Sequence, residues 1–300
     1  MLSVLIPIYN WDVVNLATTI SKQCKALGIN YEVICYDDSS GEVYKTKNRA
    51  LDAEIGISYL ELSENLGRAK IRNWMAKNAR FENLVFLDCD SEIISSDFVK
   101  NYLEYIEDID VIYGGRNYAE LPPKEKEKKL HWWYGVKRES LGLSSRKKRP
   151  YRSFQTNNFS CKRAIVLEHP FAEELTTYGY EDLLFAQTLE NNGIAISHID
   201  NPIIHKGVEN TKDFLHKSAL AAENLAVLYH SDLLSNTKMV DFHEKIKNIG
   251  FNSFFLNQIR RRKDRIHKNL LSQNPNLFYF DMYRYDIFVN KLNSLSTSSS

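Results

Sequence analysis

The chain has 300 residues, of which 43% are hydrophobic and 26% are charged, and its formal net charge is +1. A chain of this length buries a large core as one domain, alone or with an appendage. The balanced charge excludes a whole-chain polyanion binder, so we expect no nucleic-acid partner. The first residues lack the basic leader of a signal peptide, no apolar run is long enough to cross a bilayer, and the four cysteines show no disulfide or zinc spacing. The sequence therefore predicts a cytoplasmic protein.

The charge is unevenly distributed along the chain. Residues 124–152 carry eleven Lys or Arg against three Glu, a local net charge of +8 that leaves −7 for the remaining residues. A second basic run is Arg260–Lys263 together with Arg265. Such runs are most often solvated surfaces. Alternatively, they bind an anionic acceptor such as a lipid-linked diphosphate, or hold the protein against the acidic inner face of the cell membrane.

The first 115 residues alternate between strand and helix patterns. Period-two and apolar runs predict strands at 4–8, 31–36, 57–62, 84–87 and 111–113. Helical spacing predicts helices at 13–27 after a capping Asp12, at 42–53, at 67–78, and from a capping Ser95 or Ser96 to about 106. Repeated βα units imply an α/β fold with a mostly parallel sheet and helices on both faces. In such sheets ligands bind beyond the carboxyl ends of the strands.

The pattern changes after residue 115. Residues 116–152 form a polar, basic and aromatic excursion within a middle segment, 116–210. That segment is expected to hold strands at 154–165, 194–199 and 202–205 and a helix at 181–192. The last segment, 211–300, has amphipathic helical spacing and ends in a Ser-rich tail, 294–300, that is expected to be disordered.

Asp88 and Asp90 directly follow the apolar strand expected at 84–87. Two carboxylates at i and i+2 on a turn can share one cleft, and their oxygens suit Mg²⁺ or Mn²⁺. The pattern alone is weak, because a chain of this size contains about one such pair by chance. Asp108 and Asp110 are a second pair, but they precede a strand, and we interpret them as a solvated turn. Placement after a buried strand favours metal and nucleotide binding by Asp88 and Asp90.

Asp37 and Asp38 end the second expected strand. They form either a turn in which Asp side chains bond their own backbone, or a carboxylate site for a base or ribose. Glu181 and Asp182 open a helix, where the macrodipole stabilises acidic side chains. The alternative is a general base. Because the dipole alone would lower the pKa of Asp182, that role requires either partial desolvation or a hydroxyl already bonded to the carboxylate.

His205 ends the short strand expected at 202–205, and Trp132 is adjacent to Trp133. A single His after an apolar run is more often a core or surface residue than a metal ligand. The tryptophans either form a stacking platform for a sugar ring or anchor the excursion to the core. We interpret His198 as structural.

Several motifs occur in a fixed order over about residues 1–207 and together resemble the family-2 glycosyltransferases. The motifs are VLIPIYN at 4–10, YDDSS at 36–40, ENLG at 64–67 with Arg72–Asn73, FLDCD at 86–90, NNFSCK at 157–162 and YGYED at 178–182. The resemblance implies a GT-A fold, an inverting mechanism and a nucleoside-diphosphate sugar donor, of which a UDP-sugar is favoured.

The resemblance also implies roles for the donor-site residues. Pro7 and Tyr9 would line the base pocket, and Asp38 would bind the base. Arg68 is a looser match to a residue that contacts the base or the phosphates, and Asp88 would face the ribose or the metal. One departure from the family pattern is Ser39, because the family often has Gly between the Asp pair and the next Ser or Thr.

For catalysis, the resemblance implies Asp90 as the principal metal ligand, with His205 completing the site in several relatives. Asp182 would be the general base beside Glu181. We also expect Asn157, with Trp132 and Trp133, to contribute to an acceptor site.

The sequence thus predicts a metal-dependent inverting glycosyltransferase of polysaccharide biosynthesis, with Mn²⁺ or Mg²⁺ as cofactor. Residues 1–115 would bind the nucleotide sugar, 116–210 the acceptor, and 211–300 would be a helical extension. The acceptor is a hydroxyl of a saccharide or a lipid-linked saccharide. Two alternatives stay open, a sugar-phosphate nucleotidyltransferase and an inactive nucleotide- or carbohydrate-binding module. The former normally has a Gly-rich loop after the first strand, whereas no glycine precedes Gly28 here.

Overall fold

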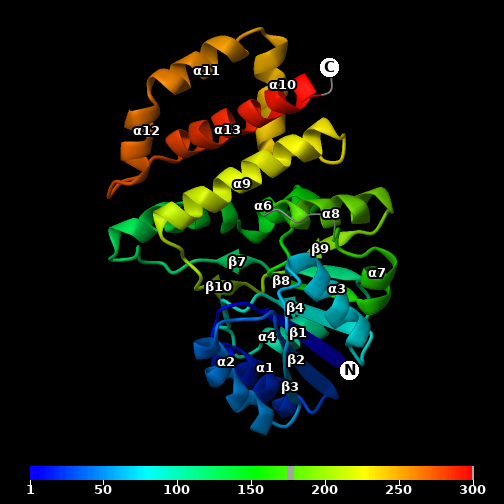
Figure 1. The fold of residues 1–300 in the computed structure, drawn as a ribbon. Coiled ribbons are helices and arrows are strands. Elements are labelled where there is room, and N and C mark those ends of the chain that lie inside the picture. The colour runs from blue at the N-terminus through cyan, green and yellow to red at the C-terminus, as the bar shows by residue number, and fades with distance from the viewer. Residues whose placement is uncertain (174–178, 299–300) are drawn as a thin grey trace. The chain divides into compact units, whose positions relative to one another are not determined.

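The computed structural model describes residues 1–173 and 179–298, so Tyr178 of the motif at 178–182 lies outside the described residues. The chain divides into two compact units. The first comprises Met1–Ala119, Ser140–Thr176 and Glu181–Gly207, and the second comprises Glu120–Glu139, Thr177–Tyr180 and Val208–Ser300. The first unit combines sheet and helices, and the second is helical (Figure 1).

A seven-stranded sheet forms the centre of the first unit, in the order β3-β2-β1-β4-β8-β6-β9. Its strands are β1 (Leu2–Ile8), β2 (Tyr31–Asp37), β3 (Ile57–Glu61), β4 (Asn83–Leu87), β6 (Val111–Tyr113), β8 (Asn158–Lys162) and β9 (Ile196–His198). Only β8 runs antiparallel to its neighbours β4 and β6. The expected mostly parallel sheet is confirmed. Because β1 lies between β2 and β4, the strand order reverses there, which is where open α/β sheets bind ligands.

A three-stranded sheet lies at the carboxyl side of β4. It has the order β5-β10-β7, with β5 (Ser91–Glu92), β10 (Ile203–His205) and β7 (Arg116–Asn117). His205 of β10 pairs with Ser91 of β5, next to Asp90. This pairing brings His205 to the turn that follows β4, although more than one hundred residues separate them.

Helices cover both faces of the large sheet. They are α1 (Val14–Ala26), α2 (Glu42–Asn48) with the 3₁₀ turn Arg49–Ala53, α3 (Arg68–Asn78), α4 (Phe98–Leu103), α6 (Leu143–Lys147), the 3₁₀ turn Tyr151–Ser153, α7 (Arg163–Glu168) and α8 (Glu181–Asn191). One buried cluster joins the sheet to α1 and α4, through Ile20 and Phe98. A second joins the opposite face to α3, α7 and α8, through Met75, Val166 and Phe185.

The helix expected from Ser95 or Ser96 and the strand expected at 154–165 are both shorter than predicted, at Phe98–Leu103 and Asn158–Lys162. The helix predicted from Ser95 or Ser96 begins at Phe98, and the Ser95 hydroxyl accepts only the N–H of Asp97. The strand predicted through residue 165 ends at Lys162, because the Glu82 carboxylate accepts the N–H of Ala164 and so caps α7. Glu82 is eighty-two residues away in sequence, so local pattern gave no sign of this cap.

The second unit is built around two long helices, α9 (Thr211–His230) and α13 (Leu277–Ser298). Its other helical elements are the 3₁₀ turn Lys126–Lys128, α5 (Lys129–Tyr134), the π-helical turn Gly135–Glu139, α10 (Lys238–Asn248), α11 (Asn252–Arg261) and α12 (Lys263–Leu270). The ring of His131 in α5 stacks on Phe214 of α9 at 4.3 Å. Helix α13 runs to Ser298 and therefore includes most of the Ser-rich segment that we expected to be disordered. None of the described helices is both long and apolar enough to span a membrane.

Candidate functional site

The turns after β1 and β2 are tied to each other. Asn10 follows β1 with a left-handed φ of 52°, and its side-chain oxygen accepts the N–H of Gly41 at 2.8 Å. In return the Ser40 hydroxyl accepts the N–H of Asn10 at 2.8 Å. Ser39 has φ of 61°, a region that glycine adopts without strain. This backbone conformation is the physical reason why glycine suits the position at which the chain departs from the family pattern.

Asp37 and Asp38 accept hydrogen bonds from the backbone of two different turns. Asp37 is fully buried and accepts the N–H of Ser40 at 2.7 Å, as the turn interpretation predicts. Asp38 instead accepts the N–H groups of Leu66 and Gly67 at 2.6 and 3.0 Å. Burial raises the pKa of Asp38, although both N–H groups oppose this. Asp38 therefore fixes the loop before α3, and each carboxylate oxygen keeps a second lone pair for a base or ribose.

Asp88, directly after β4, is held by Arg72 of α3. Its Oδ1 accepts a hydrogen bond from Arg72 Nη2 at 2.6 Å, and its backbone N–H donates to the carbonyl of Asn157 at 3.0 Å. The Arg72 side chain is only 3% exposed. A charge-assisted hydrogen bond from a buried guanidinium holds the Asp88 carboxylate in one orientation. Arg72 belongs to a motif that we identified, but no role had been assigned to it.

Asp90 and His205 form a carboxylate–imidazole pair, with Asp90 Oδ1 and His205 Nδ1 3.2 Å apart. Burial raises the pKa of Asp90, but the His205 ring and the charges of Arg116 and Arg68 outweigh it and lower that pKa to about 2. Gly207 completes the pair, because a Cβ on it would lie 2.1 Å from Asp90 Oδ2. A side chain there would fill the space beside the carboxylate.

This pair fits a divalent cation. One carboxylate and one imidazole, held side by side, supply oxygen and nitrogen ligands suited to Mn²⁺, and a cation of this kind takes its remaining ligands from water and substrate phosphate. Among the described residues, no cluster of three or more His, Cys, Asp or Glu could hold a metal alone. Asp88 directs one oxygen to Arg72 rather than to this pair.

Glu181 and Asp182 open α8 at the same edge of the sheet. Glu181 forms an ion pair with Arg68 at 3.1 Å. Burial raises the pKa of Glu181, but the charges of Arg68 and Arg72 outweigh burial, so the pKa is lowered overall. Asp182 accepts a hydrogen bond from the Thr156 hydroxyl at 2.9 Å. Burial and the adjacent Glu181 charge raise the pKa of Asp182 to about 6, against the opposing effect of Arg72 and Thr156. A carboxylate with this pKa suits a general base at neutral pH.

Asn157 is 3% exposed, and neither its amide nitrogen nor its amide oxygen has a hydrogen-bond partner in the structure. It lies between Thr156, which binds Asp182, and β8, and its carbonyl holds Asp88. An unsatisfied buried amide is costly. Its position between the two carboxylates marks it as a place where a polar ligand group would find both a donor and an acceptor.

The other expected site residues are less constrained. Pro7 pairs in register with Tyr36, and Tyr9 after β1 is 56% exposed. Trp132 and Trp133 belong to the second unit, where their rings pack at 5.0 Å and Trp132 is only 6% exposed.

The basic excursion is not uniformly a surface. Arg146 is 3% exposed and donates to the carbonyls of Leu141, Gly114 and Ile199 at 3.0, 3.3 and 2.9 Å. Its neighbours in sequence, residues 147–149, are exposed. Arg146 is therefore an internal clasp and not part of an anion-binding face.

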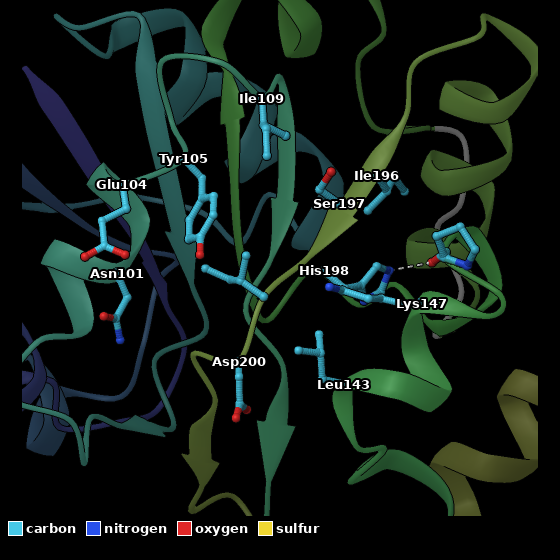
Figure 2. Close-up of a pocket in the computed structure, with 12 residues that line it drawn as sticks. Asn101, Glu104, Tyr105, Ile109, Leu143, Lys147, Ile196, Ser197, His198 and Asp200 are labelled. Carbon is cyan, nitrogen blue, oxygen red and sulfur yellow. Dashed lines mark hydrogen bonds between the residues drawn. The ribbon is translucent and has the colours of Figure 1, made fainter.

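A groove of about 650 Å³ lies beside β9, away from the expected site (Figure 2). Its lining includes Asn101, Tyr105, Leu143, Lys147, His198 and Asp200. Burial lowers the pKa of His198 to about 4, and its ring contacts Arg146 and the carbonyl of Pro150 at 3.3 and 3.0 Å. The dashed line from His198 in Figure 2 marks the contact with the Pro150 carbonyl. These contacts agree with the structural interpretation of His198, which stays a prediction.

The structure therefore brings Asp38, Asp88, Asp90, Glu181, Asp182 and His205 together at the carboxyl edge of one sheet, within the first unit. Sequence reasoning missed the supporting residues Arg72, Arg116, Thr156 and Gly207. Arg72 and Thr156 lie in or next to the motifs, and that proximity was the only signal.

Comparison with known proteins identifies the family. The family model described as "Glycosyl transferase family 2" matches residues 3–168, which is more than half of the chain. The chain belongs to glycosyl transferase family 2. Because it belongs to this family, the chain is a glycosyltransferase, and the alternative of a sugar-phosphate nucleotidyltransferase is set aside. Among curated proteins no match is found.

Solved structures resemble the glycosyltransferase over most of its length. The S. aureus TarS structure of residues 1–349 in complex with UDP-GlcNAc has a TM-score of 0.52 at 19% identity, covering 99% of this chain and 92% of that chain. A longer S. aureus TarS structure has a TM-score of 0.53 at 19% identity, covering 98% and 55%. The Pyrobaculum calidifontis mannosyltransferase in complex with GDP-Man and Mn²⁺ has a TM-score of 0.48 at 14% identity, covering 75% and 64%. The chain thus spans less than two thirds of two of these proteins. At these identities the TarS structures support the GT-A fold alone.

Proposed function

We propose that this glycosyltransferase moves a sugar, with inversion at the anomeric carbon, from a nucleoside-diphosphate sugar to a hydroxyl of a saccharide or lipid-linked saccharide. The observation that carries the proposal is Asp182, a buried carboxylate whose pKa of about 6 lies close to neutrality. It lies at the same sheet edge as Asp38 and the Asp90–His205 pair, which would hold the donor. Donor and base on one edge are what a single displacement requires.

In this reaction the acceptor hydroxyl oxygen attacks the anomeric carbon as the bond to the diphosphate breaks. Asp182 takes the hydroxyl proton, and Thr156 holds the carboxylate in place through its hydrogen bond. Asp38, Tyr9 and Pro7 would bind the base, and Arg68 the phosphates. Asp90 and His205 would hold Mn²⁺ or Mg²⁺, which when bound supplies positive charge to the departing diphosphate.

Asn157 would bind a hydroxyl of the sugar or of the acceptor, because neither the nitrogen nor the oxygen of its buried amide has a hydrogen-bond partner. Trp132 and Trp133 are proposed as acceptor-binding residues. The TarS complex with UDP-GlcNAc favours testing UDP-sugars first. We place the reaction in the cytoplasm, with basic segments at the inner face of the cell membrane.

The test is a thermal-shift and product-release panel with UDP-, GDP- and dTDP-sugars, each with and without Mn²⁺. One donor should stabilise the fold only with Mn²⁺, by about 2.7 kcal/mol at a hundredfold excess over its Kd. Anomeric NMR of the product would report inversion. If no donor stabilises the fold, the donor site is wrong; if a donor stabilises it without transfer or hydrolysis, the inactive binding module is the better function.

A further inference from the structure

We propose that the corner between α10 and α11 in the second unit is a docking surface for an anionic lipid bilayer. This corner patch consists of the apolar side chains of Ile249, Phe251 and Phe254 with the cationic side chains of Lys245 and Lys247 at the end of α10, and it extends along α11 to Arg261. The proposal concerns a surface of the second unit only and does not depend on the proposed transfer reaction.

The apolar side chains are strongly exposed. Ile249, Phe251 and Phe254 are 69%, 57% and 58% exposed, and the two rings lie 5.7 Å apart. Three large apolar side chains grouped within six residues differ from the isolated exposed residues that are normal on a protein surface. Such a group indicates a surface that is covered in use.

A fixed turn, and not a loose loop, presents these side chains. The N–H of Phe251 donates to the carbonyl of Ile246 at 3.1 Å, and the N–H of Gly250 donates to that of Lys247 at 3.0 Å. Gly250 has a φ of 70°. These two bonds and the left-handed glycine form the Schellman motif that ends α10. In this motif the residue after the glycine usually packs on the helix, whereas here Phe251 is directed to solvent.

Helix α11 is amphipathic, and its outer face carries the patch. Leu256 and Ile259 are buried on its inner side. Phe254, Asn257 and Arg261 are all exposed at spacings i, i+3 and i+7, so they share the outer face. The face thus carries an aromatic ring at one end and a cation about two turns, roughly 10 Å, further along. Helices that lie in a membrane interface combine an apolar face with flanking Lys and Arg in this way.

The segment of the chain that contains the patch carries a strongly positive net charge. Residues 238–270 contain nine Lys or Arg against Asp241, Glu244 and Asp264, a net charge of +6 within a chain whose total is +1. Lys245, Lys247 and Arg261 are exposed. Among the three acidic side chains of this segment, Glu244 accepts a hydrogen bond from the Tyr229 hydroxyl. A surface with this charge is attracted to the negative potential of a leaflet that contains anionic lipids.

The same charge argues against a second copy of this chain as the occupant. A two-fold interface would bring the patch against itself, since a symmetric dimer uses the same surface on both subunits. The cations of one copy would then face those of the other, whereas a bilayer offers lipid phosphates to the cations and acyl chains to the rings. The corner patch therefore fits a bilayer better than a copy of itself.

The experiment is co-sedimentation of the full chain with vesicles of phosphatidylglycerol and phosphatidylcholine, compared with phosphatidylcholine alone. We expect binding to the anionic vesicles only. Phe251→Ser with Phe254→Ser should weaken it at least tenfold, because the rings no longer insert. Lys245→Gln with Lys247→Gln should weaken it by about tenfold, and more at low salt. All four positions are exposed, so the variants should fold.

The matched control is Ile55→Ser, which removes an 83% exposed side chain from the first unit and should leave vesicle binding unchanged. A Phe254→Trp variant should show blue-shifted fluorescence on anionic vesicles if the ring inserts. Equal binding to both vesicle types, full binding by the double Phe variant, or a dimer that this variant dissociates would each overturn the proposal. Sugar transfer to a soluble acceptor should be the same in all these variants, which separates this test from that of the proposed function.

Discussion

At the scale of single residues, burial decides the chemistry of the acidic pair that opens α8. The helix dipole favours ionised carboxylates at both positions. Glu181 follows that expectation because Arg68 and Arg72 lie close to it, and its pKa is lowered. Asp182 does the opposite, since burial and the charge of Glu181 raise its pKa to about 6. Two adjacent carboxylates thus acquire different pKa values from their surroundings.

We therefore expect kcat/KM for transfer to fall about tenfold per pH unit below about pH 6, because Asp182 must be ionised to accept a proton. Glu181→Gln removes a charge that raises this pKa, so the acid limb should move to lower pH, by roughly half a unit to one unit.

Asp182→Asn should lower kcat by about 10²–10⁴-fold while donor Kd is retained. Initial-rate pH profiles and donor titrations measure these effects. Unchanged turnover in Asp182→Asn would remove Asp182 from the base role.

Gly207 allows a second prediction at the residue scale, about the Asp90–His205 pair. A methyl group at this position would lie 2.1 Å from Asp90 Oδ2, so Gly207→Ala must displace the carboxylate. Mn²⁺-dependent donor binding should weaken by at least tenfold, as measured by calorimetric titration, with the fold intact. The control is Gly142→Ala, because nothing lies within 4 Å of a Cβ there and its φ of −61° suits alanine. Equal donor affinity in the two variants would contradict a role for the Asp90–His205 pair.

At the scale of elements, one buried arginine fixes the segment 140–153. Arg146 lies in α6 and donates hydrogen bonds to carbonyls that follow β6 and β9. It therefore joins the excursion to the edge of the large sheet. Its hydrogen-bond partners are backbone carbonyls and the His198 ring, and burial lowers its pKa. The basic run around it would suggest a solvated surface, but the side chain acts inside the fold.

Arg146→Met should lower the free energy of unfolding by about 3 kcal/mol or more, because several buried carbonyls lose their donor at about 1–3 kcal/mol each. Arg149→Met, an exposed change in the same basic run, should cost less than about 0.5 kcal/mol. Urea denaturation measures both. Similar stabilities for the two variants would show that the buried hydrogen bonds of Arg146 do not stabilise the fold.

At the scale of the whole molecule, the chain consists of an α/β unit that holds the candidate site and a helical unit that holds the corner patch. Residues 120–139 of the basic excursion belong to the helical unit, and residues 140–152 belong to the α/β unit. The excursion is thus continuous in sequence but divided in structure. The composition of the excursion indicated an unusual segment, but only the tertiary contacts assign its two parts to different units.

The sequence by itself determined the alternation of strands and helices, and with it the sheet edge at which Asp38, Asp88 and Asp90 would meet. Those features depend on local periodicity, on turns such as that after Asp37, and on helix ends such as Gly28, all of which neighbouring residues encode. The ordered motifs added the family, which the match to residues 3–168 confirms.

Only the tertiary structure decided the features that depend on residues far apart in sequence. The Glu82 cap on α7, the Arg72–Asp88 bond, the place of Gly207 beside Asp90 and the clasp of Arg146 join segments that local pattern cannot pair. The raised pKa of Asp182 has the same origin. A pKa depends on burial and on the charges that surround the group in space, so the residue that sequence named as a base acquired a suitable pKa only from the folded chain.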